Sequence, residues 1–429
     1  MSLDLSRPAK DAPADARDWP DPYSMPLEDI NVSRPRLFED DAMWPYFARL
    51  RKEAPVHYCR ESAVGPFWSV TTFDMIMAVD TNHKAFSSDA YAGGIGLVDP
   101  PGEFVSPSFI TMDPPKHDAQ RKVVQPIVSP ANLAAMTDTI RARTQRLLDG
   151  LPRGETFDWV ERVSVELTTQ MLATLFDFPF EDRHKLPRWS DVATAVRNAR
   201  LYGGGVLESE EQRRAELTEC LEYFTRLWNE RVNAEPKADL ISMLARGEAT
   251  RNMDPKEYLG TLTLLIVGGN DTTRNSMTGG LYALSRFPEQ EAKLRADPSI
   301  IESMVSETIR WQTPLAYMRR TALEDVELGG QTIRKGDKVV MWYVSGNRDE
   351  AVFDRPNDFI IDREHPRRHL SFGFGIHRCV GNRLAELQLK ILWEEILARF
   401  PVIEVVSEPR RVRSSFVKGY ESLPVRIPA

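Results

Sequence analysis

The 429-residue sequence has only three cysteines, Cys59, Cys220 and Cys379, and they lie far apart. Such an odd and sparse set excludes a disulfide framework and is typical of a reducing compartment. The sequence also lacks the C-x-x-C spacing of structural zinc sites and iron–sulfur clusters. The fold must therefore depend on a hydrophobic core, and 42% of the residues are hydrophobic.

Long apolar runs and a basic excess are missing as well. No stretch approaches the 18 uninterrupted apolar residues of a transmembrane helix, so no membrane anchor is expected. Residues 1–25 are polar and proline-rich, without the apolar segment of a signal peptide, and are expected to form an extended arm. The net charge of −8 gives no reason to expect a nucleic-acid partner. These absences predict a soluble, cytoplasmic protein of bacterial type.

The hydrophobic pattern indicates a mostly α, α+β fold, because long helical segments are separated from short strands. The longest predicted helices are Pro255–Arg286, Ser209–Val232, Val380–Arg399, Trp159–Leu175 and Leu133–Leu148. The predicted strands are Val56–Cys59, Phe67–Thr71, Val326–Leu328, Gln331–Ile333, Lys338–Trp342, Val402–Val406 and Pro424–Ile427. The segment 90–115 holds four glycines and five prolines, so it is expected to be a long, non-helical loop of the kind that often covers a binding site.

One cysteine stands in an unusual setting, the stretch FGFGIHRCVG over residues 372–381. Glycines surround Cys379, and a helix predicted over Val380–Arg399 follows at once. The helix N-terminus and the neighbouring His377 and Arg378 favour a thiolate, which suits an axial ligand of haem iron. A buried structural cysteine, a catalytic nucleophile or a zinc ligand are the alternatives, although zinc partners are absent at the usual spacings.

This stretch resembles the haem-binding signature FGxGxHxCxG of the cytochrome P450 family at every defined position. The resemblance implies haem b as the cofactor and Cys379 as the thiolate ligand of its iron. It further implies that Phe372, Gly373 and Gly381 lie against the haem, and that His377 binds a haem propionate. The resemblance extends from about Trp44 to the C-terminus, and we expect one cytochrome P450 domain over residues 26–429.

Other motifs of the family occur in the expected order. Glu307 and Arg310 form an E-x-x-R element on one helix face, which the family buries in a structural network with Arg363; a surface ion pair is the alternative. In LLIVGGNDTTRNSM, residues 264–277, adjacent glycines cost a helix roughly 1 kcal/mol each relative to alanine. The resemblance assigns Gly268 to close haem contact, Thr272 to a hydrogen bond with dioxygen, and Asp271 to a proton relay.

The propionates need positive partners. His117 and Arg121 lie four residues apart at a predicted helix start, where a solvated basic face is the alternative. The family places a propionate clamp here and a further ligand at Arg320, with Arg319 as its neighbouring rival. Together with His377, these side chains could neutralise two carboxylates through charge-assisted hydrogen bonds.

The segments that match substrate-contact regions of the family are apolar, which favours an apolar substrate, although each residue could equally be ordinary core. The candidate pocket residues are Ile95, Leu97, Val98, Leu264, Val267, Gly268, Leu315, Met318, Phe416 and Val417.

The central-helix and cysteine motifs are similar to those of bacterial P450s that hydroxylate the terminal carbon of n-alkanes and fatty acids. The expected reaction uses O₂ and two electrons from a [2Fe–2S] ferredoxin, which a ferredoxin reductase supplies from NAD(P)H. Steroids, terpenes or aromatic compounds are the alternative substrates. A peroxygenase fits less well because it needs no proton relay, and a non-catalytic haem protein is the third possibility. The loop arginines Arg367, Arg368, Arg378 and Arg383 are either solvated charges or a docking face for the acidic ferredoxin.

Overall fold

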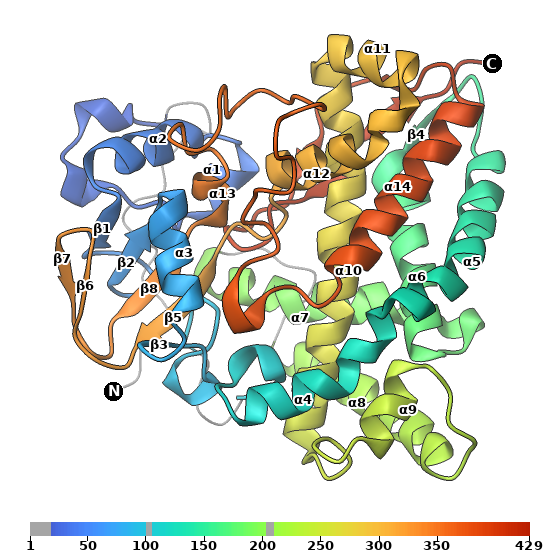
Figure 1. The fold of residues 1–429 in the computed structure, drawn as a ribbon, viewed down its shortest axis with the longest axis horizontal. Helices are drawn as coiled ribbons and strands as arrows, with labels where there is room; N and C mark the ends of the chain where they lie inside the picture. The colour runs from blue at the N-terminus through green and yellow to red at the C-terminus, as the bar shows by residue number, and fades with distance from the viewer. Residues whose placement is uncertain (1–18, 100–104, 203–209) are drawn as a thin grey trace.

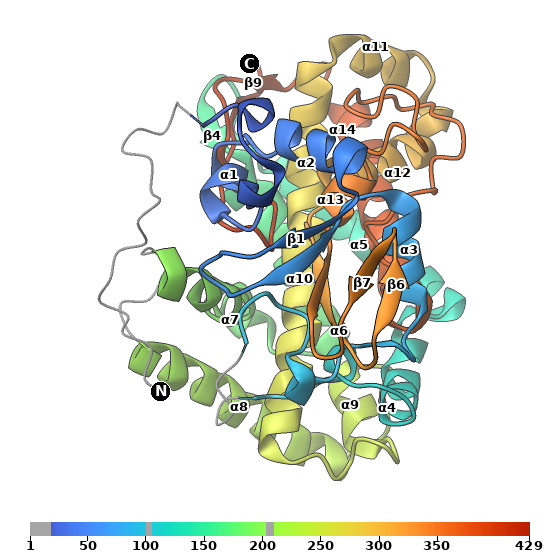
Figure 2. The same cartoon turned by 90° about the vertical axis from the view of Figure 1, so that its left-hand side faces the viewer.

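The computed structural model describes residues 19–99, 105–202 and 210–429. Most of the long helices lie on one side of the molecule and the largest sheet, with α1, α2, α3 and α13, on the other, and the long helix α10 runs through the centre (Figures 1 and 2). The described helices are α1 Pro35–Glu39, α2 Trp44–Glu53, α3 Phe73–Thr81, α4 Lys116–Val124, α5 Pro130–Asp149, α6 Glu166–Phe176, α7 Lys185–Tyr202, α8 Glu210–Val232, α9 Leu240–Arg246, α10 Pro255–Arg286, α11 Pro288–Ala296, α12 Ile301–Gln312, α13 Tyr343–Gly346 and α14 Asn382–Arg399.

The strands of the described residues form four small sheets, the largest with the order β1-β2-β8-β5-β3. Their bounds are β1 Val56–Cys59, β2 Phe67–Val70, β3 Phe86–Ser87, β4 Thr156–Asp158, β5 Met318–Ala322, β6 Val326–Leu328, β7 Gln331–Ile333, β8 Lys338–Met341, β9 Glu404–Val405, β10 Arg410–Arg411, β11 Tyr420–Ser422 and β12 Pro424–Arg426. Nearly all pairings are antiparallel; β2 and β8 pair in parallel. The predicted mostly α, α+β architecture is confirmed.

Local signals explain the elements that match the sequence prediction. Helix α10 has the predicted bounds because Asp254 caps its first N–H groups and Pro255 occupies its first turn. The hairpin of β6 and β7 turns through Gly329 and Gly330, both at positive φ. The helix predicted over Trp159–Leu175 is two elements, because a π-helical turn over Val160–Val165 precedes α6.

Some predicted segments differ in the structure or lie partly outside the described residues. The arm prediction concerns residues 1–25, of which 1–18 are not described; beyond them, Trp19 donates to Asp40 and a 3₁₀ turn covers Pro22–Ser24. The loop predicted over 90–115 is irregular except for 3₁₀ turns at Ala90–Ala92 and Phe109–Thr111, and its residues 100–104 are not described. Strand β5 was not predicted.

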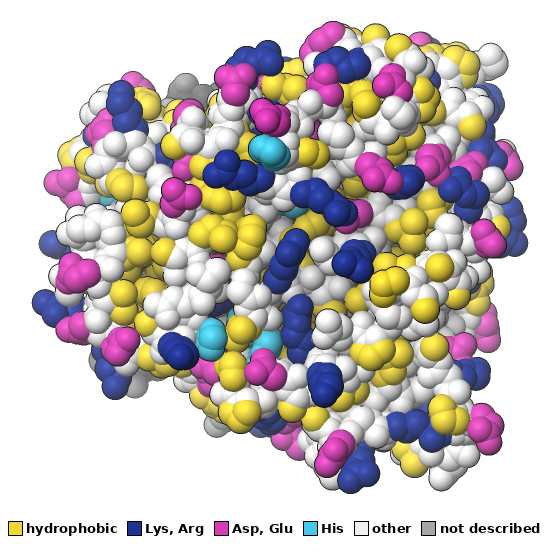
Figure 3. All heavy atoms as spheres, in the orientation of Figure 1, with side chains coloured by type: hydrophobic (Ala, Val, Ile, Leu, Met, Phe, Trp, Pro, Cys, Tyr) yellow, Lys and Arg dark blue, Asp and Glu magenta, His cyan; other side chains and the backbone are white. Residues whose placement is uncertain are grey.

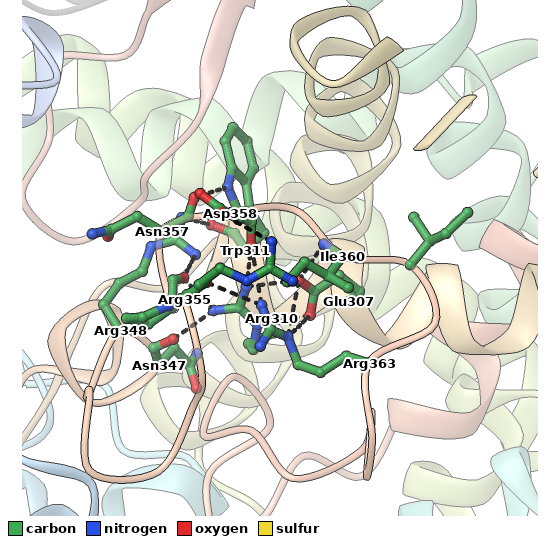
Figure 4. A network of polar contacts seen from close by, with 12 residues as sticks. Glu307, Arg310, Trp311, Asn347, Arg348, Arg355, Asn357, Asp358, Ile360 and Arg363 are labelled. Atoms are coloured by element: carbon green, nitrogen blue, oxygen red, sulfur yellow. Dashed lines mark hydrogen bonds and ion pairs between the residues drawn. The ribbon is translucent and has the colours of Figure 1, made fainter. Parts of the chain in front are cut away.

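A buried ionic network ties α12 to the segment that precedes the cysteine (Figure 4). Arg310 and Glu307 are both fully buried and form two contacts of 2.7 Å, and Arg363 Nε lies 3.1 Å from Glu307 Oε2. The Nη1 group of Arg310 donates to the backbone carbonyls of Asn347 and Pro356. Every buried charge in this group therefore has several partners, as buried charges require.

The network also reaches the cysteine segment, residues 370–381. The Asn347 side chain accepts from the N–H of Leu370 at 2.7 Å and donates to the Ser371 hydroxyl at 2.9 Å. Ser371 in turn donates to the carbonyl of Ile309 in α12. The start of the cysteine segment is thus held by the same helix that carries the ion pair, and its position does not depend on local sequence alone.

Candidate functional site

A cavity of about 440 Å³ lies between α10 and the cysteine segment. Cys379 faces this cavity from one side and is exposed to it. Gly268 and Thr272 face it from α10. A Cβ built on Gly268 would meet no protein atom within 4 Å, so this glycine leaves open space in the cavity.

The backbone around Cys379 is folded tightly by glycines and hydrogen bonds. Gly373 and Gly375 adopt positive φ, and a Cβ at Gly375 would lie 2.5 Å from the carbonyl oxygen of Asp80. The N–H of Cys379 donates to the Phe372 carbonyl at 2.8 Å. These contacts turn the sulfur toward the cavity shortly before α14 begins.

The charge state of Cys379 depends on opposing effects. Burial raises the pKa of the thiol, while a hydrogen bond from the Gly381 N–H and the nearby guanidinium groups of Arg121 and Arg378 lower it. The protein thus surrounds the sulfur with positive potential and an amide donor, and a metal cation would complete the stabilisation of the thiolate.

A group of cationic and imidazole side chains gathers beside the sulfur. Arg121, Arg320 and His377 line the cavity, and the ring of His117 lies 4.5 Å from the ring of His377. Burial, followed by the charges of Arg320, His117 and Arg121, lowers the pKa of His377 to about 2. His117 Nε2 and His377 Nδ1 are buried without a hydrogen-bond partner. Positive charge and unpartnered ring nitrogens together fit the two propionates of a haem.

The neighbouring arginines of β5 are separated by strand geometry, since successive side chains point to opposite faces. Arg320 lines the cavity and pairs with the buried Asp80 at 2.8 Å. Arg319 instead pairs with Asp99 at 2.6 Å and donates to the carbonyl of Gly96. Of the two arginines, Arg320 is therefore the one that lines the cavity.

The acidic and hydroxyl residues of α10 point in different directions. Thr272 lines the cavity and donates to the Gly268 carbonyl at 2.8 Å. Asp271 does not line the cavity. Its Oδ1 accepts a hydrogen bond from the Ser190 hydroxyl at 3.0 Å and lies 3.0 Å from the Arg274 guanidinium. Its Oδ2 is buried without a hydrogen-bond partner. Burial raises the pKa of Asp271, and Arg274 opposes this shift. The unpartnered oxygen is a place where a proton can reside.

All ten candidate pocket residues line the cavity, from the 95–98 segment, α10, the approach to β5 and the 416–417 segment. Sequence reasoning missed a set contributed by other helices, by turns and by the first turns of α10, namely Phe109, Thr111, Met171, Leu175, Ala193, Thr194, Arg213, Leu217, Leu240 and Leu259. No local signal marks these residues, because an apolar helix face looks the same toward a core and toward a cavity.

Comparisons with known proteins agree with this geometry. The family described as Cytochrome P450 matches residues 206–421. Linalool 8-monooxygenase of Pseudomonas putida is 36% identical over 410 residues, which cover 93% of this chain and 99% of that protein. A methyl-branched lipid omega-hydroxylase of Mycobacterium bovis is 29% identical over 94% of this chain and 96% of its own length.

Among solved structures, CYP153D17 from Sphingomonas sp. PAMC 26605 is 50% identical, with a TM-score of 0.87 over 93% of this chain and 99% of that chain. Cytochrome P450-153 from Novosphingobium aromaticivorans is 46% identical, with a TM-score of 0.86 over 92% and 99%. The cysteine, the cation group and the open face of α10 fit haem b, the cofactor of this family. The chain belongs to the cytochrome P450 family and is a haem-dependent monooxygenase.

Proposed function

We propose that this monooxygenase hydroxylates the terminal carbon of n-alkanes or fatty acids, with O₂ and two electrons from a ferredoxin. The observation that carries the proposal is the lining of the cavity, which is mostly apolar away from Arg121, Arg320 and His377. No Asp or Glu among the described residues lines it, and Arg213 does, so an anionic chain end meets no like charge. The resemblance of the central-helix motif to terminal hydroxylases supports the same substrate class.

Haem with a thiolate ligand supplies the activation of O₂ and the insertion of one oxygen atom into a C–H bond. The protein must determine which carbon is hydroxylated, because electronic effects do not favour reaction at a primary C–H bond. Choice therefore depends on holding the chain end near the iron in a restricted geometry. Leu264 and Val267 from α10, Leu315 and Met318 near β5, and Phe416 are the side chains we assign to this positioning.

A ligand panel tests the substrate class. Binding of n-alkanes and fatty acids of increasing length to the ferric enzyme should displace water near the iron and shift the spin-state absorbance. Mass spectrometry of the turnover products should then show terminal alcohols in excess over internal ones. A response confined to terpenes, steroids or aromatic compounds would overturn the proposal and would favour the chemistry named for the linalool relative.

Thr272 and Asp271 are proposed to deliver protons to dioxygen. The hydroxyl of Thr272 reaches the cavity, and the buried Asp271 stands next to it in the helix with one free carboxylate oxygen. Replacing Thr272 by Ala should leave substrate binding intact while most electrons go to peroxide, and Thr272→Ser should restore product formation. An unchanged ratio of product to NAD(P)H in Thr272→Ala would remove Thr272 from proton delivery.

Electrons are proposed to arrive from a separate ferredoxin that docks over the cysteine segment. Lys and Arg side chains gather along the middle of the face that carries α14 and the chain before it (Figures 1 and 3). Arg378 and Arg383 are exposed there, and Arg367 pairs with Glu386. Arg383→Glu should raise the KM for an acidic ferredoxin several-fold at low salt, whereas Arg334→Glu on the β6–β7 hairpin should not. Equal effects of the two variants would refute this docking face.

A further inference from the structure

The chain from Ala90 to Asp99 forms part of the cavity wall, to which it contributes Ile95, Leu97 and Val98. Several contacts join this segment to β5 and the residue before it, and two of them involve its backbone between Ile95 and Leu97. The N–H of Arg319 donates to the Ile95 carbonyl at 3.0 Å, and the N–H of Leu97 donates to the Tyr317 hydroxyl at 3.1 Å. The wall has no helix or strand of its own beyond the turn at Ala90–Ala92, so such contacts hold it in place.

The strongest contacts are at the end of the segment. Asp99 Oδ1 lies 2.6 Å from Arg319 Nη1, and Asp99 Oδ2 lies 2.6 Å from Lys338 Nζ. The side chains of Arg319 and Lys338 are only 3% and 14% exposed, whereas Asp99 is 56% exposed. One carboxylate on the irregular wall thus neutralises two nearly buried cations on β5 and β8. Charges that are so little hydrated need this partner.

The segment is also shaped around the arginine. Gly93 has a φ of +117°, and a Cβ at this position would lie 2.1 Å from Arg319 Nη2. Arg319 Nη1 donates to the Gly96 carbonyl, and Lys338 Nζ donates to the Val64 carbonyl at 2.8 Å. The segment therefore encloses the Arg319 guanidinium, and it would lose these contacts if the segment moved away from β5.

We propose that Asp99 is a positioning residue whose ion pairs with Arg319 and Lys338 hold the 90–99 segment closed over the haem cavity and so limit the rates of ligand entry and exit. We call these two ion pairs the Asp99 latch. The latch does not act as a pH switch near neutral pH. Burial opposes ionisation of Asp99, but hydrogen bonds from Lys338 and Arg319 lower its pKa below the ordinary value. Salt should weaken the latch, because Asp99 is half in solvent.

Stopped-flow binding of 4-phenylimidazole to the ferric holoenzyme tests the latch, because this azole coordinates haem iron whatever the natural substrate is. Asp99→Asn should raise both the association and the dissociation rate at least fivefold, with little change in Kd, while Asp99→Glu should stay near wild type. Asp325→Asn, which breaks an exposed pair with Arg334, is the matched control and should change neither rate. Raising the salt concentration from 0.05 to 0.5 M should speed binding to the wild type more than to Asp99→Asn.

Lys338→Met provides a second variant if Asp99→Asn does not fold, since it removes one pair and leaves Arg319 with Asp99. It should raise both rates by a smaller factor. The proposal is overturned if the rates of the folded variants stay within twofold of wild type, or if Asp325→Asn speeds binding equally. Neither result bears on the proposed substrate class, which the alkane and fatty-acid panel tests separately.

Discussion

The buried network around Glu307 allows a quantitative prediction. Glu307 is fully buried and accepts from the Arg310 guanidinium twice at 2.7 Å, from Arg363 and from the N–H of Ile360. Replacing Glu307 by Gln keeps the shape of the side chain but removes the negative charge that both of these arginines contact. Breaking a buried pair by neutralising one partner costs about 3–5 kcal/mol, so we expect the free energy of unfolding to fall by that amount.

Guanidinium denaturation of the holoenzyme, followed by fluorescence of its nine tryptophans, measures this loss at equal haem content. Glu421→Gln is the control, because the pair of Glu421 with Arg410 is exposed and its loss should change stability by less than about 1 kcal/mol. The Ser371–Cys379 segment is tied to the same helix, so haem should also dissociate faster from Glu307→Gln. A loss in Glu307→Gln no larger than that in Glu421→Gln would refute the reasoning.

Two further predictions concern single side chains. Gly268→Ala should raise the free energy of unfolding by up to about 1 kcal/mol through helix propensity, yet weaken substrate binding, because its Cβ enters the cavity. Gly269→Ala should gain less stability, since its Cβ would lie 2.8 Å from Leu172. Burial lowers the pKa of Lys418 to about 7, so the unfolded chain binds the extra proton between pH 7 and about 10 and native stability rises across that window. Lys418→Met should remove up to about 1.4 kcal/mol per pH unit of this slope in denaturation curves, and an unchanged slope would contradict it.

The sequence by itself determined those features that depend on neighbours in the chain. The cysteine stretch could be assigned a haem role because the glycines, histidine and cysteine that resemble the family signature are contiguous, and the start of α10 is set by its neighbouring Asp254 and Pro255. The β6–β7 hairpin followed from its two glycines. In each case the physical cause, a cap, a turn or a backbone conformation, lies within a few residues.

Only the tertiary structure decided where side chains point and which distant groups they meet. Strand β5 was missed because its MRRTA sequence carries two arginines, which become buried only through Asp80 and Asp99, more than 200 residues away. The choice of Arg320 over Arg319 for the cavity rests on the pleat of that strand. Thr272 and Asp271 are adjacent in sequence, yet the helix rotates about 100° per residue and turns the carboxylate toward α7. These outcomes depend on long-range packing, which a linear pattern does not encode.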